Sequence, residues 1–312
     1  MKVLITGGTG FVGKHLVRAL LSEGTEVHLL VRDEKKAVRM FGSDVVVHRV
    51  DFYSKKSLSD AFAGSGARVL IHLIGILFEV PSRGITFERV HFEIPKNLYE
   101  VAREMGIRKI VHMSALGTSD NSPSKYHRTK RMAERMLMES GVNYVILRPS
   151  LILGPEQKLF KDMDRITRIL PVVALPGGGG YLFQPVSVRD VADSFVGAVK
   201  KRKWDRKILS LCGPQRVSFR KLLEDTFGLL GRKVLMVPLP KKVMFWTARA
   251  VETLIQPPPF SSDQMLMMWK DNICGLDPEE IPDGVKCLTE REPEDYHEAL
   301  RWSVEEYLRT SS

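Results

Sequence analysis

The chain has 312 residues, of which 44% are hydrophobic and 27% charged, with 24 Gly, 17 Pro and 3 Cys. This composition is that of a globular protein long enough for two lobes, and it excludes collagen-like, disulfide-scaffold and disordered classes. The net charge of +10 would suit nucleic acid, an anionic membrane or an acidic ligand, but the basic residues are spread along the sequence. A solvated basic surface is the simplest interpretation.

Short β-branched runs alternate with amphipathic stretches in the first half of the chain. This alternation is typical of a parallel sheet covered on both faces, which right-handed crossovers make doubly wound. The predicted strands are 2–6, 26–31, 45–50, 69–73, 109–113 and 143–148, and the predicted helices are 13–23, 87–105 and 126–140.

The pattern changes after residue 150. A helix and then a loop are predicted over 154–180, and three prolines at 257–259 predict a stiff break. Further predicted strands are 183–186 and 208–212, and further predicted helices are 187–200, 219–230, 242–255 and 263–271.

A glycine-rich turn, T-G-G-T-G-F-V-G at 6–13, joins the first strand to the first helix. Gly7 permits a tight turn, Gly10 leaves room for a pyrophosphate, and Gly13 lets the helix pack closely. The helix N-terminus offers unpaired N–H groups and a positive dipole end to phosphates. The residues of this turn expected at the cofactor are Thr6, Gly7, Gly10, Phe11, Val12 and Gly13.

This turn predicts the fold class, an α/β doubly wound Rossmann domain with a smaller, discontinuous C-terminal lobe. We expect residues 1–150 and about 181–200 to form the dinucleotide-binding domain. The smaller substrate or cover lobe is expected from about 151–180 and 201–312.

The end of the second strand predicts the nucleotide preference. Arg32 stands where an acidic residue would bind a ribose 2′-hydroxyl, and its guanidinium can pair with a 2′-phosphate. NADP(H) is therefore favoured over NAD(H), although Asp33 is adjacent and a solvated Arg32 remains an alternative. Asp51 and Phe52 follow the third strand, where a side chain can touch the adenine; a helix cap is the alternative for Asp51.

Tyr126 and Lys130 are four residues apart and so share one helix face. An ammonium group nearby lowers the pKa of a phenol, which would make Tyr126 a useful acid or base, and the same Lys130 can hold the nicotinamide ribose. Ser114, at the end of the fifth strand, could help to polarise a carbonyl oxygen. The alternative is that Tyr126 and Lys130 only hold the ribose.

Together these motifs resemble the short-chain dehydrogenase/reductase superfamily, and most closely its extended and atypical branch. The segments H-M-S-A-L-G, Y-H-R-T-K-R-M-A-E, I-L-R-P-S-L-I-L-G-P and Q-P-V-S-V-R-D-V-A carry the resemblance beside the glycine turn. S-P-S-K-Y-H-R-T-K and V-I-L-R-P are most similar to the group around the NAD(P)H-binding accessory subunit of respiratory complex I. The resemblance covers residues 1–200 well and the rest loosely.

The resemblance implies hydride-transfer chemistry at Ser114, Tyr126 and Lys130. It also implies that Pro149 and Ser150 lie at the nicotinamide end of the cofactor. The chain departs from the family where His72-Leu73-Ile74-Gly75 replaces an Asn-rich stretch and where His91 stands in place of a helix Asn. Leu73, Ile74 and Gly75 are still expected to border the cofactor.

The remaining residues give weaker signals. The three scattered cysteines argue against a disulfide frame or a zinc site, and the scattered His72, His91 and His112 predict no metal centre. The N-terminus enters a strand without a signal-peptide pattern, so we expect a cytoplasmic protein, with peripheral membrane association left open.

A basic, partly apolar helix is expected at Lys241–Ile255. It can lie in a membrane interface, but covering the substrate cleft with Trp246 in the core is favoured. Met265, Met267, Met268 and Trp269 would form an apolar wall. If that wall faces the nicotinamide, the substrate is expected to be apolar, for example quinone-like.

Two functions compete. The first is an NADP(H)-dependent oxidoreductase or epimerase-like enzyme acting on a small molecule. The second is a non-catalytic NAD(P)H-binding accessory or assembly protein of a respiratory or quinone-related system. Nucleic-acid binding ranks last, because no basic stripe with interleaved aromatic residues is present, and the oligomeric state is left undecided.

Overall fold

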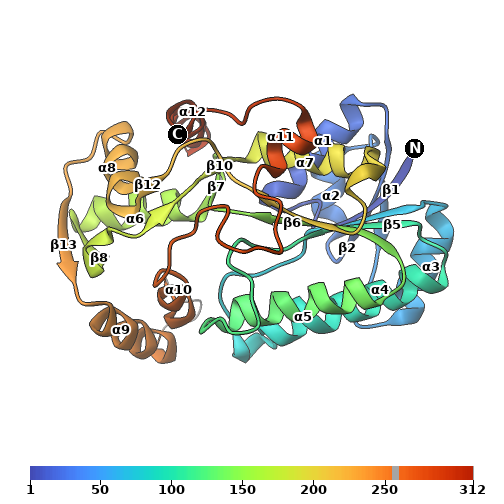
Figure 1. Ribbon diagram of the computed structural model, residues 1–312, viewed down its shortest axis with the longest axis horizontal. Helices are drawn as coiled ribbons and strands as arrows, with labels where there is room; N and C mark the ends of the chain where they lie inside the picture. The colour runs from blue at the N-terminus through green and yellow to red at the C-terminus, as the bar shows by residue number, and fades with distance from the viewer. Residues whose placement is uncertain (255–259, 312) are drawn as a thin grey trace.

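The computed structural model describes residues 1–254 and 260–311. The expected helix end at Ile255 and the proline break at 257–259 lie outside the described residues. A seven-stranded parallel sheet with the order β11-β6-β5-β4-β1-β2-β3 confirms the doubly wound α/β fold (Figure 1). Its strands are β1 (Lys2–Thr6), β2 (Glu26–Val31), β3 (Val46–Arg49), β4 (Val69–His72), β5 (Lys109–Met113), β6 (Asn143–Pro149) and β11 (Lys207–Leu211).

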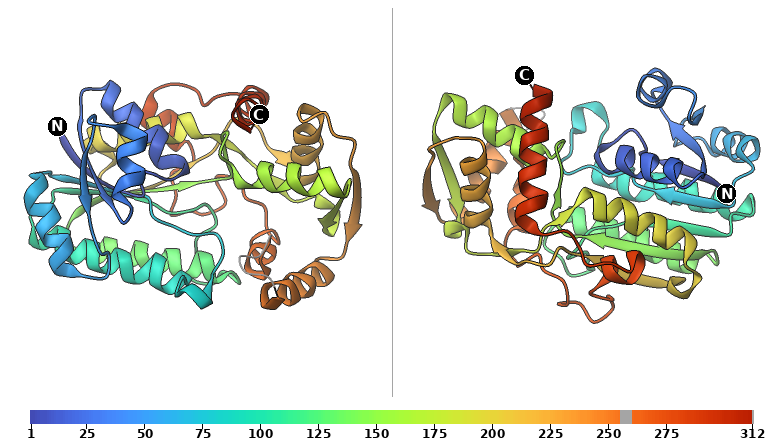
Figure 2. Two further views of the ribbon diagram at one scale, coloured as in Figure 1. Left: turned by 180° about the vertical axis from the view of Figure 1, so that it is seen from behind. Right: turned by 90° about the horizontal axis from the view of Figure 1, so that it is seen from above.

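Helices cover both faces of this sheet, as Figure 2 shows from two further directions. Because side chains alternate along a strand, Val3 and Ile5 enter the core on one face and Leu4 enters the core on the other. One face carries α1 (Phe11–Ser22), α2 (Glu34–Phe41), α7 (Val188–Lys200) and α11 (Gly284–Thr289); the other carries α3 (Lys55–Ser65), α4 (Ile94–Glu104) and α5 (Lys125–Glu139).

The helix expected over 87–105 is interrupted near its start. A π-helical turn, η2 (Arg89–Glu93), leads into α4, which has Pro95 in its first turn. Helices α2 and α3 were not predicted. Both are short, and both begin at side-chain caps, Asp33 and Ser54, that local spacing alone did not mark.

A second core forms the smaller lobe. Its buried side chains include Phe160, Leu175, Phe219 and Tyr296. Its elements are β7 (Ile152–Leu153), α6 (Lys158–Ile169), β8 (Val172–Pro176), β9 (Leu182–Phe183), β10 (Val186–Ser187), β12 (Val217–Ser218), α8 (Phe219–Leu229), β13 (Leu235–Leu239), α9 (Lys241–Leu254), α10 (Ser262–Met267) and α12 (Tyr296–Ser311).

After α6 and the short strands of this lobe, the chain returns to the main sheet and forms α7 and β11. β11 is the edge strand beside β6, and the backbone of Ile281 bonds to both Ile208 and Ser210 along it. α11 then packs on α7, so tightly that a Cβ on Gly197 would lie 2.3 Å from the Leu288 carbonyl oxygen. We therefore propose that the Rossmann unit consists of residues 1–150 together with α7, β11 and α11, so that it begins later than the expected residue 181 in this part of the chain.

The helix over 242–255 differs from the expectation. Met244 and Ala248 of α9 pack against Met265 of α10, but Trp246 is 67% exposed, so its expected place in the core was wrong. Trp246 points outward because it lies two residues from each of the buried positions. Met268 accepts a bond from the Tyr181 hydroxyl at 3.5 Å, within the second lobe.

Candidate functional site

The glycine turn runs from β1 into α1. Gly7 has a φ of +75°, which other residues rarely adopt. A Cβ on Gly13 would lie 2.1 Å from the Gly7 carbonyl oxygen, so the start of α1 rests on the turn. A Cβ on Gly10 would meet only that oxygen, at 3.1 Å, and Gly10 has no side chain to cap the first N–H groups of α1. This bare helix N-terminus fits a pyrophosphate.

Other side chains of the turn face the protein. Thr6 Oγ1 is 2.7 Å from His72 Nδ1, and Val12 belongs to the core. Phe11 packs so close to Gly154 that a Cβ on Gly154 would lie 2.6 Å from the ring. Any contact that Thr6 or Val12 makes with a cofactor would therefore come from the backbone.

The end of β2 leaves Arg32 exposed beside a capped helix. Asp33 Oδ1 accepts the Lys36 N–H at 3.0 Å and thereby caps α2. A second guanidinium, that of Arg89, lies 4.5 Å over the Tyr53 ring. Burial raises the pKa of Tyr53, and the charges of Arg89 and Arg32 oppose that rise, so both cations act on this ring.

The two residues after β3 differ in burial. Phe52 is 3% exposed and packs in the core, so any contact that it makes with an adenine would come from its backbone. Asp51 accepts the Tyr53 N–H at 2.9 Å, and Ser54 rather than Asp51 caps α3. Of the two, only Asp51 is exposed at this edge of the sheet.

The segment after β4 packs between the glycine turn and α5. A Cβ on Gly7 would lie 3.1 Å from the Leu73 carbonyl carbon and 3.2 Å from the Ile74 nitrogen. A Cβ on Gly75 would lie 3.1 Å from Lys130 Nζ. Gly75 therefore leaves room for the ammonium group, which links this segment to the predicted catalytic helix.

Ser114 directly follows β5, and Tyr126 and Lys130 lie on α5. Lys130 is buried, and its Nζ donates to the Met113 carbonyl at 3.0 Å, one residue before Ser114. Ser114 Oγ donates to Thr118 Oγ1 at 3.4 Å. The Tyr126 ring lies edge-on to His91, with ring centroids 5.2 Å apart. Lys130 thus lies at the carboxyl end of β5, and the Tyr126 ring, one helical turn earlier on α5, packs against His91.

The two ionisable groups have shifted pKa values. Burial lowers the pKa of Lys130 to about 8, against an opposing effect of Glu134. Burial also raises the pKa of Tyr126, and the charge of Asp263 raises it further. The expected lowering of the Tyr126 pKa is therefore not found, because desolvation and a carboxylate both disfavour the phenolate.

Three histidines that are far apart in the sequence meet beside Lys130. His72 and His112 are register partners on β4 and β5, with stacked rings 5.5 Å apart, and His91 Nε2 accepts the Ile76 N–H at 3.0 Å. Burial and the Lys130 charge lower the pKa of His72 to about 3 and the pKa values of His91 and His112 well below normal. These rings are neutral packing and bonding groups at neutral pH.

Asp263 reaches this site from the second lobe, and no local sequence pattern predicted its contact with α5. Its carboxylate accepts bonds from Ser124 Oγ at 2.6 Å, Lys125 N at 2.6 Å and Tyr126 N at 3.2 Å. A carboxylate is favourable at a helix N-terminus. Asp263 on α10 therefore caps α5, the helix that carries Tyr126 and Lys130.

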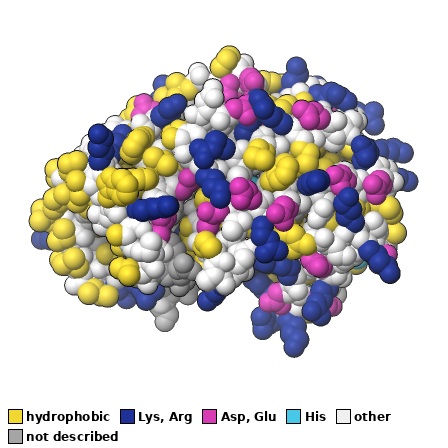
Figure 3. All heavy atoms as spheres, turned by 90° about the horizontal axis from the view of Figure 1, so that it is seen from below, with side chains coloured by type: hydrophobic (Ala, Val, Ile, Leu, Met, Phe, Trp, Pro, Cys, Tyr) yellow, Lys and Arg dark blue, Asp and Glu magenta, His cyan; other side chains and the backbone are white. Residues whose placement is uncertain are grey.

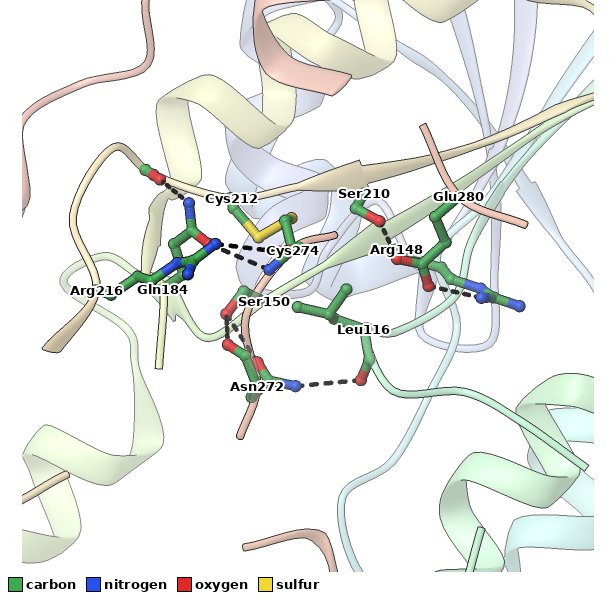
Figure 4. Close-up of a disulfide and its surroundings, with 11 residues drawn as sticks. Leu116, Arg148, Ser150, Gln184, Ser210, Cys212, Arg216, Asn272, Cys274 and Glu280 are labelled. Carbon is green, nitrogen blue, oxygen red and sulfur yellow. Dashed lines mark hydrogen bonds and ion pairs between the residues drawn. A yellow bond between two sulfur atoms is a disulfide. The ribbon is translucent and has the colours of Figure 1, made fainter. Parts of the chain in front are cut away.

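The segment after α10 also returns to the predicted nicotinamide end. The Pro149 carbonyl accepts the Leu116 N–H at 3.0 Å, and Ser150 Oγ donates to Asn272 Oδ1 at 2.7 Å (Figure 4). The Asn272 amide donates in turn to the Leu116 carbonyl at 3.2 Å. Ser150 is thus bonded to the segment that follows α10 and returns to the edge of the main sheet.

A disulfide joins Cys212 and Cys274 beside these residues, with Cα atoms 6.2 Å apart. The expectation that the cysteines form no disulfide was wrong. The two residues are 62 positions apart and meet only because the 272–274 segment returns to the end of β11. Cys287 is a free thiol.

A network of buried ion pairs joins Arg148 to Glu134 and Glu280. Arg148 on β6 is fully buried and binds Glu134 through two bonds of 2.8 and 2.6 Å, and Glu280 at 2.6 Å. These carboxylates raise the pKa of Arg148 despite its burial. Because Glu134 is one helical turn from Lys130, the network fixes the position of the helix that holds the lysine.

Comparison with known proteins places this arrangement in a family. Residues 3–211 match the NAD dependent epimerase/dehydratase family. The chain belongs to this family. The resemblance to extended short-chain dehydrogenases/reductases is thereby confirmed, and the chain is an NAD(P)-binding member of that superfamily.

Curated relatives and solved structures add detail. The chain is 30% identical over 263 residues to mitochondrial NADH dehydrogenase (ubiquinone) 1 alpha subcomplex subunit 9 of Arabidopsis thaliana, covering 82% of this chain and 64% of the relative. It is 37% identical over 240 residues to ceramide reductase of Caulobacter vibrioides, covering 76% and 73%. The fold matches NADPH-dependent quinone oxidoreductase of Escherichia coli complexed with NADPH, with a TM-score of 0.74, 19% identity and coverage of 98% and 99%.

The part of the chain that the structure describes contains neither a membrane-spanning helix nor a cluster of metal ligands. Within 1–254 and 260–311, no helix is both long and apolar enough to cross a bilayer. Among the same residues, no group of three or more His, Cys, Asp or Glu side chains is arranged to hold a metal ion.

Proposed function

We propose that this chain is an NAD(P)-dependent oxidoreductase in which Tyr126 exchanges a proton with the substrate. The observation that carries the proposal is the buried Lys130, one helical turn from Tyr126 and bonded to the carbonyl that precedes Ser114. A buried cation is costly, so a lysine in this position needs a role that offsets its burial. Holding ribose hydroxyls beside a reacting phenol is such a role.

Each residue has a distinct part in the proposed reaction. A bound nicotinamide dinucleotide supplies or accepts the hydride. In reduction, the Tyr126 hydroxyl gives its proton to the carbonyl oxygen of the substrate, and Ser114 Oγ donates a hydrogen bond to the same oxygen. The raised pKa of Tyr126 keeps the phenol protonated at neutral pH, which suits a proton donor. Lys130 supports the negative charge left on Tyr126.

We propose an apolar carbonyl compound as the substrate. The support comes from the names of the similar proteins, a ceramide reductase and a quinone oxidoreductase, which both act on largely apolar molecules. The predicted apolar wall gives no independent support, because Met265 and Met268 pack inside the second lobe.

We further propose that NADP(H) is preferred over NAD(H). Arg32 is exposed at the ribose end, and the neighbouring Asp33 carboxylate is engaged in capping α2. We expect NADPH to raise the melting temperature more than NADH does, and Arg32→Ala to remove most of that difference. Arg39→Ala, on the nearby helix α2, is the matched control. Equal shifts by both nucleotides in the unmodified protein would contradict the preference.

Tyr126→Phe tests the catalytic proposal. We expect turnover of quinone and ketone substrates with NADPH to fall about 10²- to 10⁴-fold, the usual contribution of a general acid. The melting-temperature rise caused by NADPH should be retained, because the phenyl ring keeps its packing. Tyr144→Phe, at the opposite end of the sheet, is the control. Undiminished turnover in Tyr126→Phe would exclude Tyr126 as the proton donor.

A non-catalytic accessory role is the second candidate. It is favoured by the Arabidopsis relative, a respiratory NADH dehydrogenase subunit, although the chain spans only 64% of that protein's length. In this case the bound nucleotide would stabilise the chain, and Tyr126→Phe would leave respiratory NADH oxidation by membranes unchanged. Deletion of the whole chain would lower that oxidation.

A further inference from the structure

Helix α9 of the second lobe has two different apolar faces. Met244 and Ala248 on one side of α9 are buried against Met265 of α10. On the other side, Val243, Trp246 and Leu254 are 49%, 67% and 83% exposed. Because these three residues are three and eight positions apart, they lie along one stripe of the helix. A packed surface helix normally keeps its outward face polar, so the exposed stripe needs an explanation.

The charges beside the stripe all have one sign. Lys242 and Arg249 are exposed on α9, seven residues apart and therefore on the same side. The only carboxylate of the helix, Glu252, turns to α10, where it accepts bonds from Ser262 N at 2.7 Å and Ser262 Oγ at 2.8 Å. The outward face of α9 therefore presents cations and apolar side chains without an acidic group.

The position of the lysines points to an anion. Lys241 and Lys242 occupy the first turn of α9, where no acidic residue is present. The positive end of the helix dipole disfavours cations at this place. Lys241 Nζ donates to the Trp269 carbonyl at 3.4 Å and lies 5.4 Å over the Tyr181 ring, whereas Lys242 is exposed. Together with the N-terminal N–H groups, Lys242 would attract a phosphate placed against the start of α9.

Aromatic residues extend the stripe onto the neighbouring segment. The Phe245 ring lies 5.4 Å from the Trp246 ring and 6.4 Å from the Trp269 ring, and Trp269 is 40% exposed. In the view from below, hydrophobic side chains gather at the end of the molecule formed by the second lobe, with basic side chains beside them (Figure 3). Trp and Lys beside exposed aliphatic groups are characteristic of a membrane interface.

We propose that the outward face of α9 docks on an anionic lipid bilayer. Trp246, Val243 and Leu254 enter the headgroup region, while Lys242 and Arg249 bind lipid phosphates. A second copy of the chain is a poorer partner, since this face has no carboxylate to pair with the cations of its counterpart. The proposal does not depend on the proposed reaction, but it brings α10 and its Asp263, which caps the Tyr126 helix, near the bilayer.

Vesicle co-sedimentation tests the proposal with the full chain. We expect binding to vesicles of phosphatidylcholine containing phosphatidylglycerol, weaker binding to phosphatidylcholine alone, and loss of binding as salt is raised. The double variant Lys242→Gln/Arg249→Gln should reduce binding to the anionic vesicles at least about tenfold, as should Trp246→Ser/Leu254→Ser. Lys35→Gln/Lys36→Gln and Val38→Ser, on α2 of the Rossmann unit, are the matched controls.

Three results would overturn the proposal. The first is a wild-type chain that does not sediment with the anionic vesicles, and the second is undiminished sedimentation of both α9 variants. The third is a dimer in light scattering that Trp246→Ser/Leu254→Ser converts to monomer, which would assign the face to a second copy. Each variant is first shown to keep the wild-type melting temperature and NADPH-induced shift, so that loss of binding does not reflect loss of fold.

Discussion

Lys130 shows how one side chain ties the candidate site to the energetics of folding. Its ammonium group is buried at the end of β5, where it donates to the Met113 carbonyl, and burial lowers its pKa from 10.5 to about 8. The folded state therefore carries an energetic penalty for the protonated lysine that the unfolded chain does not. The penalty is the cost of keeping a cation ready beside Tyr126.

The pH dependence of stability should reveal this penalty. Between pH 8 and 10.5 the unfolded chain holds the Lys130 proton while the folded chain has released it, so stability rises with pH in this window. Relative to Lys130→Met, the wild type should gain up to about 3 kcal/mol in free energy of unfolding across the window, measured by urea denaturation. A difference that is the same at both pH values would show that Lys130 titrates normally. Lys36→Met, at an exposed position, is the control.

At the scale of elements, the junction between α10 and α5 connects the two lobes. The carboxylate of Asp263 satisfies two backbone N–H groups at the start of α5 and also accepts the hydroxyl of Ser124. Ser124 alone occupies the local cap position and bonds the His127 N–H at 3.3 Å. Helix α5 is thus capped twice, once from its own sequence and once from the second lobe.

Removal of the second cap should cost stability. We expect Asp263→Ala to lower the free energy of unfolding by about 1–2 kcal/mol, and Asp263→Asn to lower it less, because Asn is also a good cap. Asp283→Ala is a matched control, since Asp283 precedes α11 without a side-chain cap bond. Chemical denaturation of the three variants measures the effect. Equal losses in Asp263→Ala and Asp283→Ala would mean that the inter-lobe bonds contribute nothing.

At the scale of the whole molecule, local patterns predicted the main sheet well. The strands of the first half are short apolar runs, and the glycine turn fixes the first strand–helix junction, so both can be recognised without knowledge of distant residues. The Tyr126–Lys130 pair was found for the same reason, because helical spacing is a local property. The long C-terminal helix α12 was not predicted, since its apolar positions are separated by several charged residues.

Contacts between distant segments could not be predicted. His72, His91 and His112 meet only after β4, β5 and η2 have assembled. The pairing of Cys212 with Cys274 requires the chain after α10 to return to the sheet, and the contact of Asp263 with α5 requires α10 to lie against the start of that helix. Burial also changed the expected electrostatics, since the sign of the Tyr126 shift depends on a carboxylate from the second lobe.

The returning chain has a consequence for how the molecule can be divided. The family match ends at residue 211, but Arg148 inside that region takes Glu280 as a partner, and Ile281 completes the hydrogen bonding of β11. A fragment truncated at residue 211 would keep the glycine turn and the Tyr126–Lys130 pair. It would nevertheless leave backbone groups of β11 unbonded and remove Glu280, a carboxylate that binds the buried Arg148. The region that matches the family is therefore shorter than the smallest fragment that we expect to fold alone.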